Sequence, residues 1–378
     1  MIAAALVAPG RIELIHLRSP VLGPHDVRVA PAAVGVCGTD LHIYSGESNF
    51  HLDERGQPIP LERSPQVLGH EIAGKVLEVG RAVQDLRPGA RVVLDQGRNC
   101  RSERREPACE YCASGASHQC ELYAEHGITG LPGGFAEELV LPAVNAIGIE
   151  SDLGFAGAAL AEPLACVLHA LDHAQRACAR YRLGSSELLE RVRAVAILGA
   201  GPAGLFFVQV LRNVSGFDGP ILVSDPSAQK RALAERFGAE AFAPEHLLDA
   251  VLARTQGRRV EVLVEASGSG PAFAGIPALI RKQATVLLYG IGHGGVSLEL
   301  LNGVQWREAV LVTSVGASGG FDVDGRPAVY RRALELLERR TLAVAPLLTH
   351  AYRGLVEVPR AFQGDHAAPE YVKGVALL

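Results

Sequence analysis

The sequence contains few aromatic residues, few lysines and no long uninterrupted apolar run. Aromatic side chains account for 5% of its 378 residues, which argues weakly against a broad hydrophobic pocket. Only four of the 36 basic residues are lysines, and we attribute this arginine bias to a GC-rich genome rather than to function. The net charge of −5 gives no indication of a nucleic-acid partner.

No apolar run reaches the length of a membrane span, so we expect no membrane partner. The N-terminal segment MIAAALVAPGRIELIH has no basic n-region and soon reaches polar residues, unlike a secretory signal peptide. These two observations predict a cytoplasmic protein. The chain is too long for one ordinary hydrophobic core, so two domains are expected.

The composition changes along the chain. Residues 1–153 combine short apolar alternations with many Gly and Pro residues, which predicts a β-rich domain. Residues 154–318 alternate strand-like runs with helical stretches, which predicts a doubly wound parallel sheet covered by helices on both faces. Residues 319–378 contain one clear helical stretch and a closing strand-like run. The predicted fold class is α/β.

Two short stretches of the first domain carry candidate metal ligands. GVCGTDLHIYSG contains Cys37, and VLGHEIAGKVLEVG contains His70 and Glu71. A thiolate, an imidazole and a carboxylate with an open fourth position are typical of a catalytic zinc rather than a structural one. Such a zinc lowers the pKa of a bound hydroxyl, so that an alcohol becomes able to release hydride.

The residues after Cys37 offer groups that move protons. Thr39 supplies a hydroxyl for the substrate oxygen, and His42 supplies a second imidazole. The carboxylate of Asp40 suits a position behind the metal, where it would orient His70 through its other ring nitrogen. A lone His such as His42 is more often a satisfied surface or core residue, so the interpretation depends on the whole combination.

A glycine motif predicts a dinucleotide site. Gly199, Gly201 and Gly204 follow the apolar run VAIL and open an apolar helical stretch, with Pro202 and Ala203 between the last two glycines. The first glycine makes the tight turn, the second lets the backbone approach the pyrophosphate, and the third lets helix and strand pack closely. The helix N-terminus then faces the phosphates.

The next strand-like run ends in Asp225, a carboxylate suited to accept the ribose hydroxyls of NAD and to repel the 2′-phosphate of NADP. Lys230 is well placed to touch the same ribose. Because Asp225 as a helix N-cap is the alternative, NAD is favoured over NADP but not settled. The glycine turns at residues 265–270 and 288–292 are either ordinary strand ends or part of the cofactor edge of the sheet.

On the motifs C-G-T-D-x-H, G-H-E and G-A-G-P-A-G, the chain resembles the zinc-containing medium-chain dehydrogenase/reductase family, most of all its polyol, threonine and sugar dehydrogenase branch. The resemblance implies a GroES-like catalytic domain, a Rossmann NAD-binding domain and a C-terminal segment that returns to the catalytic domain. It implies a proton path from Thr39 through the ribose hydroxyls and His42 to solvent. It places Glu162 at or near the zinc and leaves open whether Glu71, Glu162 or both in turn bind the metal. It also implies backbone contacts to the nicotinamide around Gly290, Gly292 and Val315.

Four of the seven cysteines crowd into one segment, which in a cytosolic-looking chain favours a metal over disulfides: Cys100, Cys109, Cys112 and Cys120. They resemble the family's structural zinc lobe, here at about residues 96–121, whose spacing is C-x2-C-x2-C-x7-C. The last three cysteines match, but eight residues, RSERREPA, replace the first two-residue gap. These charged residues suit an exposed loop, and zinc requires converging thiolates rather than a fixed chain path. We therefore expect a structural zinc; the alternative is a three-cysteine remnant without metal. Cys166 is interpreted as a packing residue.

The predicted function is a zinc-dependent oxidoreductase that transfers hydride to NAD from a secondary alcohol of a polyol, sugar, cyclitol or amino alcohol. The polar segment 45–66 either borders a cleft for such a substrate or is a solvated loop. The alternatives are a threonine or simple alcohol dehydrogenase of the same family, a zinc-free quinone or enone reductase, and a non-enzymatic redox sensor. The intact set of Cys37, His70 and Glu71 argues against the last two. Because family members are usually dimers or tetramers, a homodimer or homotetramer is expected.

Overall fold

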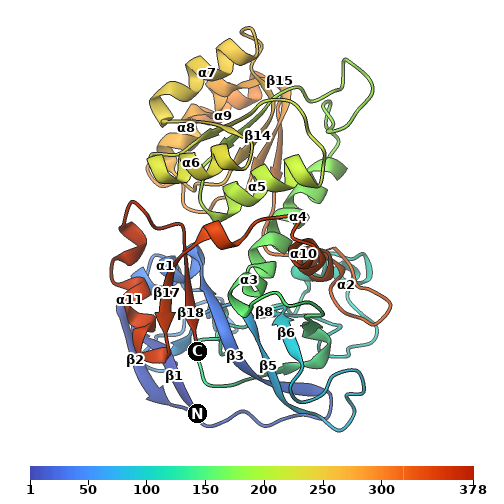
Figure 1. The fold of residues 1–378 in the computed structure, drawn as a ribbon, viewed down its shortest axis with the longest axis vertical. Helices are drawn as coiled ribbons and strands as arrows, with labels where there is room; N and C mark the ends of the chain where they lie inside the picture. The colour runs from blue at the N-terminus through green and yellow to red at the C-terminus, as the bar shows by residue number, and fades with distance from the viewer. Residues whose placement is uncertain (318) are drawn as a thin grey trace. The chain divides into compact units, whose positions relative to one another are not determined.

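The computed structural model describes residues 1–317 and 319–378, which form two compact units (Figure 1). Unit 1 contains Met1–Ala165 and Ala317–Leu378, and unit 2 contains Cys166–Gly316. The second domain boundary expected from the sequence falls on Ser318, which lies outside the described residues.

Unit 1 consists mainly of β-strands. Seven of them form one sheet in the order β10-β6-β5-β3-β18-β17, with β9 also paired to β3. The C-terminal strand β18 runs antiparallel to β3, so the two ends of the chain belong to the same unit (Figure 1). The bounds of these strands are β3 (Asp26–Val36), β5 (Glu71–Val79), β6 (Arg91–Leu94), β9 (Leu139–Pro142), β10 (Ala146–Gly148), β17 (Leu348–Arg353) and β18 (Lys373–Leu377).

Two smaller sheets and several short helices complete unit 1. A three-stranded sheet has the order β2-β1-β4, and β7 pairs with β8. The strands are β1 (Ile2–Ala8), β2 (Arg11–His16), β4 (Gln66–Val67), β7 (Gly97–Arg98) and β8 (Ala124–Glu125). The helices are α1 (Gly38–Ser45), α2 (Glu110–Ala113), α3 (Phe155–Ala159), α10 (Ala328–Glu338) and α11 (Val358–Phe362), while α4 (Ala161–Arg176) begins in unit 1 and ends in unit 2.

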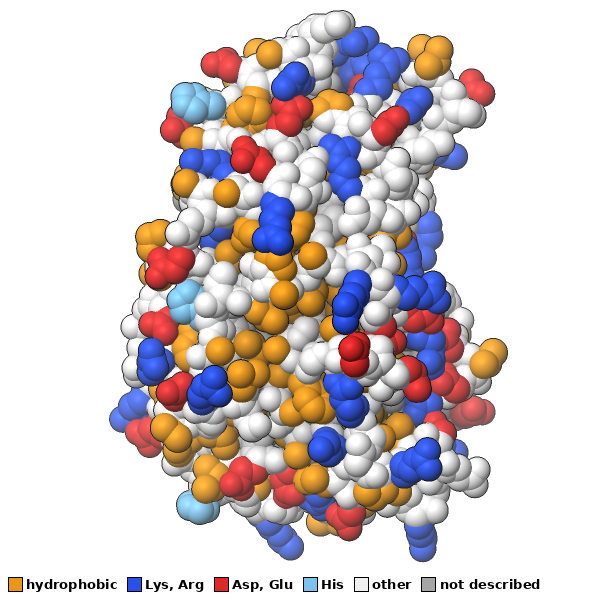
Figure 2. Space-filling view, viewed as in Figure 1, with side chains coloured by type: hydrophobic (Ala, Val, Ile, Leu, Met, Phe, Trp, Pro, Cys, Tyr) orange, Lys and Arg blue, Asp and Glu red, His pale blue; other side chains and the backbone are white. Residues whose placement is uncertain are grey.

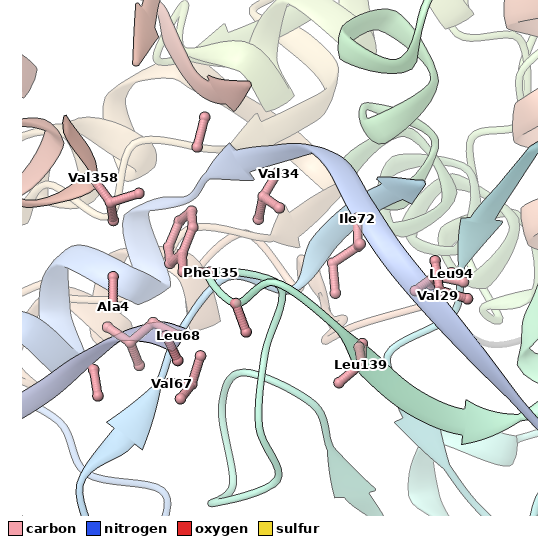
Figure 3. Close-up of a cluster of buried hydrophobic side chains, with 14 of the residues drawn as sticks. Ala4, Val29, Val34, Val67, Leu68, Ile72, Leu94, Phe135, Leu139 and Val358 are labelled. Carbon is pink, nitrogen blue, oxygen red and sulfur yellow. The ribbon is translucent and has the colours of Figure 1, made fainter. Parts of the chain in front are cut away.

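The core of unit 1 lies between the sheets and is centred on Phe135, which is fully buried (Figure 3). Val34 of β3 and Ile72 of β5 contribute to this cluster, as does Leu68 in the turn before β5. The alternation of buried and half-buried residues in the first part of β3 gives way to a fully buried run, as expected for a strand covered on both faces. The core therefore fixes the ends of β3 and the start of β5, from which the candidate metal ligands project.

Unit 2 contains a six-stranded parallel sheet in the order β13-β12-β11-β14-β15-β16. Because the chain proceeds outward from β11 in both directions, right-handed crossovers place α5 and α6 on one face and α7, α8 and α9 on the other (Figure 1). The strands are β11 (Val195–Leu198), β12 (Ile221–Ser224), β13 (Glu240–Phe242), β14 (Val260–Glu265), β15 (Ile280–Leu288) and β16 (Val310–Thr313). The helices are α5 (Pro202–Asn213), α6 (Ala228–Arg236), α7 (Leu247–Arg254), α8 (Gly270–Leu279) and α9 (Leu300–Gln305).

One helical stretch, Phe155–Arg176, is long and apolar enough to cross a membrane by length and composition alone. However, 78% of its most apolar window is buried inside the protein, and core helices pass the same test. On the face of the molecule drawn in Figure 2, acidic and basic side chains are interspersed rather than gathered by sign. This face therefore presents no field of a single sign.

Candidate active site and cofactor site

Three of the predicted catalytic ligands meet in unit 1. Within the described part of the chain, Cys37, His70 and Glu71 form a group whose ligand atoms all lie within 4.8 Å of one another. Cys37 follows the last residue of β3, and His70 and Glu71 stand at the start of β5. Because β3 and β5 are antiparallel neighbours in which Gly35 faces Glu71, sheet pairing brings the two motifs together.

Asp40 ties the two motifs to each other. Its carboxylate accepts the backbone N–H of Cys37 at 2.9 Å and that of Gly69 at 3.2 Å. Its Oδ1 also lies 3.3 Å from Nδ1 of His70. Asp40 is fully buried in the first turn of α1, and Gly69 has a φ of +88°, which an L side chain rarely adopts. The predicted role of Asp40 behind His70 is thus consistent with the observed contacts.

The surroundings of His70 favour a positive charge at this position. Burial alone lowers the pKa of the imidazole, but the charges of Asp40 and Cys37 outweigh burial and raise it well above its usual value. His70 is 3% exposed, so these charges act with little screening by water. The group formed by Cys37, His70 and Glu71 is therefore prepared for a cation.

Glu71 is held by a buried lysine that the sequence analysis missed. Nζ of Lys373 in β18 donates to Oε1 of Glu71 at 2.5 Å, and both side chains are buried. Glu71 reaches β18 across Gly35, where any Cβ would overlap Oε2 of the carboxylate. Burial lowers the pKa of Lys373, but the charge of Glu71 raises it above its usual value.

A buried carboxylate oxygen with no partner is the best indication that a metal fits this site. Oε2 of Glu71 has no hydrogen-bond partner among the described residues, although it is buried. Leaving such an acceptor without a partner is costly unless a ligand satisfies it. Together with a thiolate and an imidazole, this oxygen completes the N, O and S donor set that zinc prefers.

The proposed proton-path residues lie on the first helix after Cys37. Oγ1 of Thr39 is 3.8 Å from Sγ of Cys37. Thr39 and His42 are three residues apart on α1, so they share one side of the helix. Nδ1 of His42 lies 2.6 Å from Oε2 of Glu47, and the His42 side chain is 39% exposed. The path therefore has one end beside the metal ligands and the other end in contact with solvent.

Polar side chains of the segment after α1 form hydrogen bonds within the segment itself. Oδ1 of Asn49 accepts the N–H of His51 at 2.9 Å, and Oδ1 of Asp53 accepts that of Arg55 at 2.8 Å. Such contacts are typical of turns. They favour the solvated-loop interpretation for these residues, whereas the carboxylate of Glu47 contacts the imidazole of His42.

Glu162 lies in a buried polar network of unit 1. It is 5% exposed, and its Oε1 accepts Nε2 of Gln96 at 3.0 Å. Tyr330 donates to the other end of the Gln96 amide, and Gln96 also lies 3.4 Å from Oε1 of Glu125. Glu162 is not a member of the described ligand group of Cys37, His70 and Glu71. Its predicted metal role stays a prediction.

The same network concentrates acidic groups away from water. Burial raises the pKa of Asp95 to about 7, an effect to which the charges of Glu125 and Glu162 add. Burial also raises the pKa of Glu125, against the opposing charge of His70. The influence of His70 on Glu125 shows that this acidic group lies within the field of the metal site. No motif in the sequence indicated Glu125, Gln96 or Tyr330.

The four clustered cysteines converge on one point. The ligand sulfurs of Cys100, Cys109, Cys112 and Cys120 all lie within 4.8 Å of one another. The sulfur of Cys120 is 3.7 Å from that of Cys100 and 3.9 Å from that of Cys109. A tetrahedron with zinc–sulfur bonds of about 2.3 Å has edges of about 3.8 Å. Backbone N–H groups lower the pKa of the Cys109 thiol to about 6, whereas burial raises the pKa of the Cys112 and Cys120 thiols.

The long first gap folds back onto unit 1. Oδ1 of Asn99 accepts the N–H groups of Arg101 and Ser102 at 2.9 and 3.3 Å, which turns the chain where the inserted residues begin. Ser102 is buried and donates to Oδ1 of Asn145 at 2.7 Å. The charged residues of the insertion are exposed, as expected, while the buried Ser102 attaches the insertion to the rest of unit 1.

In unit 2, the three motif glycines have the geometry that their assigned roles require. Gly199 has a φ of +100° and turns the chain after β11. A Cβ at Gly204 would overlap the carbonyl oxygen of Gly199, so only glycine fits there. A Cβ at Gly201 would meet nothing within 4 Å, which leaves the backbone open to a ligand. Gly201 is the N-cap of α5, and Pro202 and Ala203 open this helix, so its N-terminal N–H groups face the open space.

Asp225 follows β12 and is buried at 7% exposure. Its Oδ2 accepts the N–H of Ala200 in the glycine turn at 2.8 Å, and its Oδ1 accepts that of Ser227 at 2.8 Å. Each carboxylate oxygen retains a second acceptor site, so both remain able to accept ribose hydroxyls. Lys230 lies in the first turn of α6, the helix that follows Asp225, and its backbone N–H donates to Oγ of Ser227.

The two later glycine turns pack against each other through Glu265, which the sequence analysis did not single out. This fully buried carboxylate ends β14, accepts the N–H of Ser267 at 2.9 Å and lies 2.6 Å from Nε2 of His293. A Cβ at Gly290 would overlap the N atom of Gly268, which explains the glycine there. Gly292 has a φ of +136°, and Val315 is half exposed.

Comparison with known proteins places this arrangement in a family. The family model described as "Alcohol dehydrogenase GroES-like domain" matches residues 23–151, and "Zinc-binding dehydrogenase" matches residues 202–339. L-threonine 3-dehydrogenase of Pyrococcus furiosus is 31% identical over 93% of this chain and 91% of its own length. The chain belongs to the zinc-type medium-chain dehydrogenase/reductase family.

Further relatives agree with this assignment. Sorbitol dehydrogenase of Arabidopsis thaliana is 28% identical over 98% of this chain and 93% of its own length. The solved structure of a zinc-binding dehydrogenase from Sinorhizobium meliloti 1021 bound to NADP is 29% identical. It superposes with a TM-score of 0.78 and covers 100% of this chain and 99% of its own.

Family membership confirms several predictions from the sequence. The protein is an oxidoreductase with a GroES-like domain and a Rossmann domain, and its family uses zinc and a nicotinamide dinucleotide. The comparisons do not distinguish NAD from NADP. Substrates of the family are small alcohols.

Proposed function

We propose that this protein is an NAD-dependent dehydrogenase that oxidises a secondary alcohol of a polyol, sugar, cyclitol or amino alcohol. The observation that carries the proposal is the group of Cys37, His70 and Glu71, in which the buried Oε2 of Glu71 has no partner among the described residues. When bound, zinc supplies a Lewis acid that acidifies a substrate hydroxyl, and the dinucleotide accepts the hydride.

The chain's own residues prepare the alcohol and remove its proton. Asp40, whose Oδ1 lies 3.3 Å from Nδ1 of His70, would orient the imidazole, and Lys373 holds Oε1 of Glu71 while Oε2 has no partner among the described residues. The hydroxyl of Thr39, close to Cys37, would accept the proton of the substrate hydroxyl as it passes its own proton on towards His42. His42 then releases the proton to solvent, assisted by Glu47 at 2.6 Å.

Two features support a hydroxylated or amino-bearing substrate. The named relatives act on threonine and sorbitol, both of which carry secondary alcohols next to further polar groups. The charge of His70 acts on the buried carboxyl of Glu125, which Gln96 links to Glu162, so acidic groups lie within reach of the charge of the metal site. Asp225 supports NAD, because its carboxylate would repel a 2′-phosphate.

The test is a panel of polyols, aldoses, inositols and amino alcohols, followed by NADH absorbance and repeated with NADP. Oxidation of at least one such alcohol with NAD is expected. We expect the Thr39→Ala variant to bind zinc and NAD but to turn over about 10²–10⁴-fold more slowly, because the substrate proton loses the hydroxyl that relays it. Ser215→Ala removes an exposed hydroxyl of unit 2, so it is the matched control and should behave as the parent enzyme.

A zinc assay separates the rival functions. About two zinc ions per chain fit the proposal, one catalytic and one structural. A protein without zinc that reduces quinones or enones would contradict it, as would a Thr39→Ala variant with normal turnover and pH dependence. A zinc-loaded protein that oxidises none of the alcohols would favour the redox-sensor alternative.

We further propose that the protein forms a homodimer or homotetramer in the cytoplasm. β16 is an edge strand of the parallel sheet, and its Leu311 is 42% exposed. An unpaired edge with an exposed apolar residue is a template for pairing with a second copy. Light scattering should give a multiple of the chain mass, reduced in Leu311→Lys. A monomeric parent protein would contradict the proposal.

A further inference from the structure

A cavity of about 780 Å³ lies in unit 2, at the edge of the sheet opposite the glycine turns. It is lined by residues that precede β14 and β16, such as Arg259 and Arg307, and by the first residues of β15. The dinucleotide motif, in contrast, follows the carboxyl end of β11. Because all six strands are parallel, the two sites are at opposite ends of the strands.

The cavity is strongly basic. Among the described residues, Arg281 alone of its six cations has a carboxylate within 4.0 Å, that of Glu261 at 2.8 Å. Glu308, the one acidic residue in the lining, accepts instead from Gln283 at 3.2 Å. The six cationic lining residues are Arg180, Arg258, Arg259, Arg281, Lys282 and Arg307.

Helix ends account for the position of the arginines but not for their number. Arg259 donates to the carbonyl of Ala278 at 2.8 Å, and Arg307 donates to that of Gly303 at 2.9 Å, near the C-termini of α8 and α9. Arg258 donates to Thr255 after α7 at 3.2 Å. Each helix end carries a partial charge of about −0.5, so three ends neutralise only a fraction of six cations.

The arginines also repel one another. Burial lowers the pKa of Arg307, and the neighbouring charge of Arg259 lowers it further. An anion placed between two such guanidinium groups would relieve the repulsion and gain charge-assisted hydrogen bonds.

The backbone around the cavity is strained. Arg259, Gln283 and Glu308 have φ values of +68°, +59° and +49°, in the left-handed region that L side chains rarely adopt. They are three of seven such non-glycine residues in the described chain, and all three line this cavity. Strained residues of this kind concentrate at active sites and ligand clamps.

Aromatic groups complete the lining. The guanidinium groups of Arg180 and Arg281 lie 5.6 and 5.5 Å from the ring centroid of Tyr181. The indole of Trp306 is 86% exposed at the same cavity. A large exposed aromatic ring beside several arginines is a surface on which a planar base stacks.

We propose that this cavity is a second ligand site that binds a nucleoside triphosphate, with the phosphates on the arginines and the base against Trp306. The size of the cavity lies within the range of small-molecule sites. Such a site would be separate from the dinucleotide site, which follows the carboxyl end of β11.

Trp306 makes the proposal testable, because it is the only tryptophan of the chain. The full-length enzyme, first saturated with NAD to fill the dinucleotide site, is titrated with ATP at low salt while tryptophan fluorescence is recorded. A saturable change is expected, and it should weaken as salt screens the arginines.

Variants locate the binding. Arg180→Gln and Arg258→Gln should each weaken ATP binding by about tenfold, the loss of one charge-assisted hydrogen bond. Arg180 contacts Gln283 by a side-chain hydrogen bond, so removing its charge leaves the main-chain contacts of the unit in place. Arg236→Gln on the exposed side of α6 removes the same charge elsewhere and should bind ATP as the parent does.

Three results would overturn the proposal. The first is the absence of any saturable ATP signal, confirmed by calorimetry on the NAD-saturated enzyme. The second is equal ATP affinity in the parent, Arg180→Gln and Arg258→Gln proteins. The third is equal affinity for inorganic triphosphate and ATP, since the base would then contribute nothing at Trp306.

Discussion

Replacing Lys373 by Met should destabilise unit 1 more than the loss of any other single lysine. The ammonium group is the partner of Glu71 Oε1 at 2.5 Å, and both side chains are buried. Met has a similar length and fills the same space, so the change removes the charge with little loss of packing. It leaves the carboxylate of Glu71 buried with no partner for either oxygen.

The magnitude follows from the burial of the pair. Removing one partner of a buried ion pair costs about 3–5 kcal/mol, because the remaining charge is uncompensated. Since the total stability of a domain is about 5–15 kcal/mol, this is a large share of it. At about 2–4 °C per kcal/mol, the unfolding midpoint of the metal-free protein should fall by roughly 6–20 °C. Saturating zinc should reduce the loss, because a cation beside Glu71 replaces part of the missing charge.

Thermal unfolding is measured on chelator-treated and zinc-saturated protein. Lys75→Met is the matched control, because Lys75 is exposed on β5, the strand that carries Glu71, and should change stability little. The double variant Glu71→Gln, Lys373→Met should be more stable than the sum of the single losses predicts. Equal midpoints for the parent and Lys373→Met in the metal-free state would refute the reasoning.

Three further predictions concern the cofactors and their supports. Asp225→Ser should weaken the binding of NAD and relatively favour NADP, because the charge that repels the 2′-phosphate is removed. Steady-state kinetics with both cofactors decide this, and a parent enzyme that prefers NADP would contradict it. Cys112→Ser should lower the metal content by about one zinc ion per chain and lower thermal stability while catalytic zinc stays in place; unchanged metal content would show that the lobe holds none. Gly35→Ala should lower the zinc content of the catalytic site, because the new Cβ would displace Glu71, while the four-cysteine site keeps its zinc. Equal zinc content in the variant and the parent would contradict this.

Much of the fold could be predicted because strong local patterns coincide with its elements. The runs VAIL and VEVLVE became the buried strands β11 and β14, and the helical stretch near the C-terminus became α10. β13 was missed, because Glu240–Phe242 is three residues long and has no apolar run. Short edge strands of this kind form through pairing with a neighbour, which a local pattern does not encode.

The candidate site was predictable where its chemistry is contiguous in sequence, and less so where it depends on tertiary contacts. Cys37, His70 and Glu71 belong to short motifs, and the pairing of β3 with β5 brings them together. Lys373 is 302 positions from Glu71, so no spacing rule links the two. Its signal was present nonetheless, as a lysine within an apolar closing strand in a chain with only four lysines.

The contacts of Glu71 and Glu162 bear on which of them binds the metal. Glu71 is held at Oε1 by Lys373, so its Oε2 is able to bind zinc while the ion pair stays intact. Glu162 accepts from Gln96, and its oxygens are not within the 4.8 Å group. For Glu162 to become a ligand, the side chain must first move and give up the contact with Gln96, which itself is fixed by Tyr330. A hydrogen bond to a charged group contributes about 1.5–3 kcal/mol, a cost that Glu71 does not incur. We therefore infer that Glu71 is the resident carboxylate ligand and that Glu162 acts in the surrounding polar network.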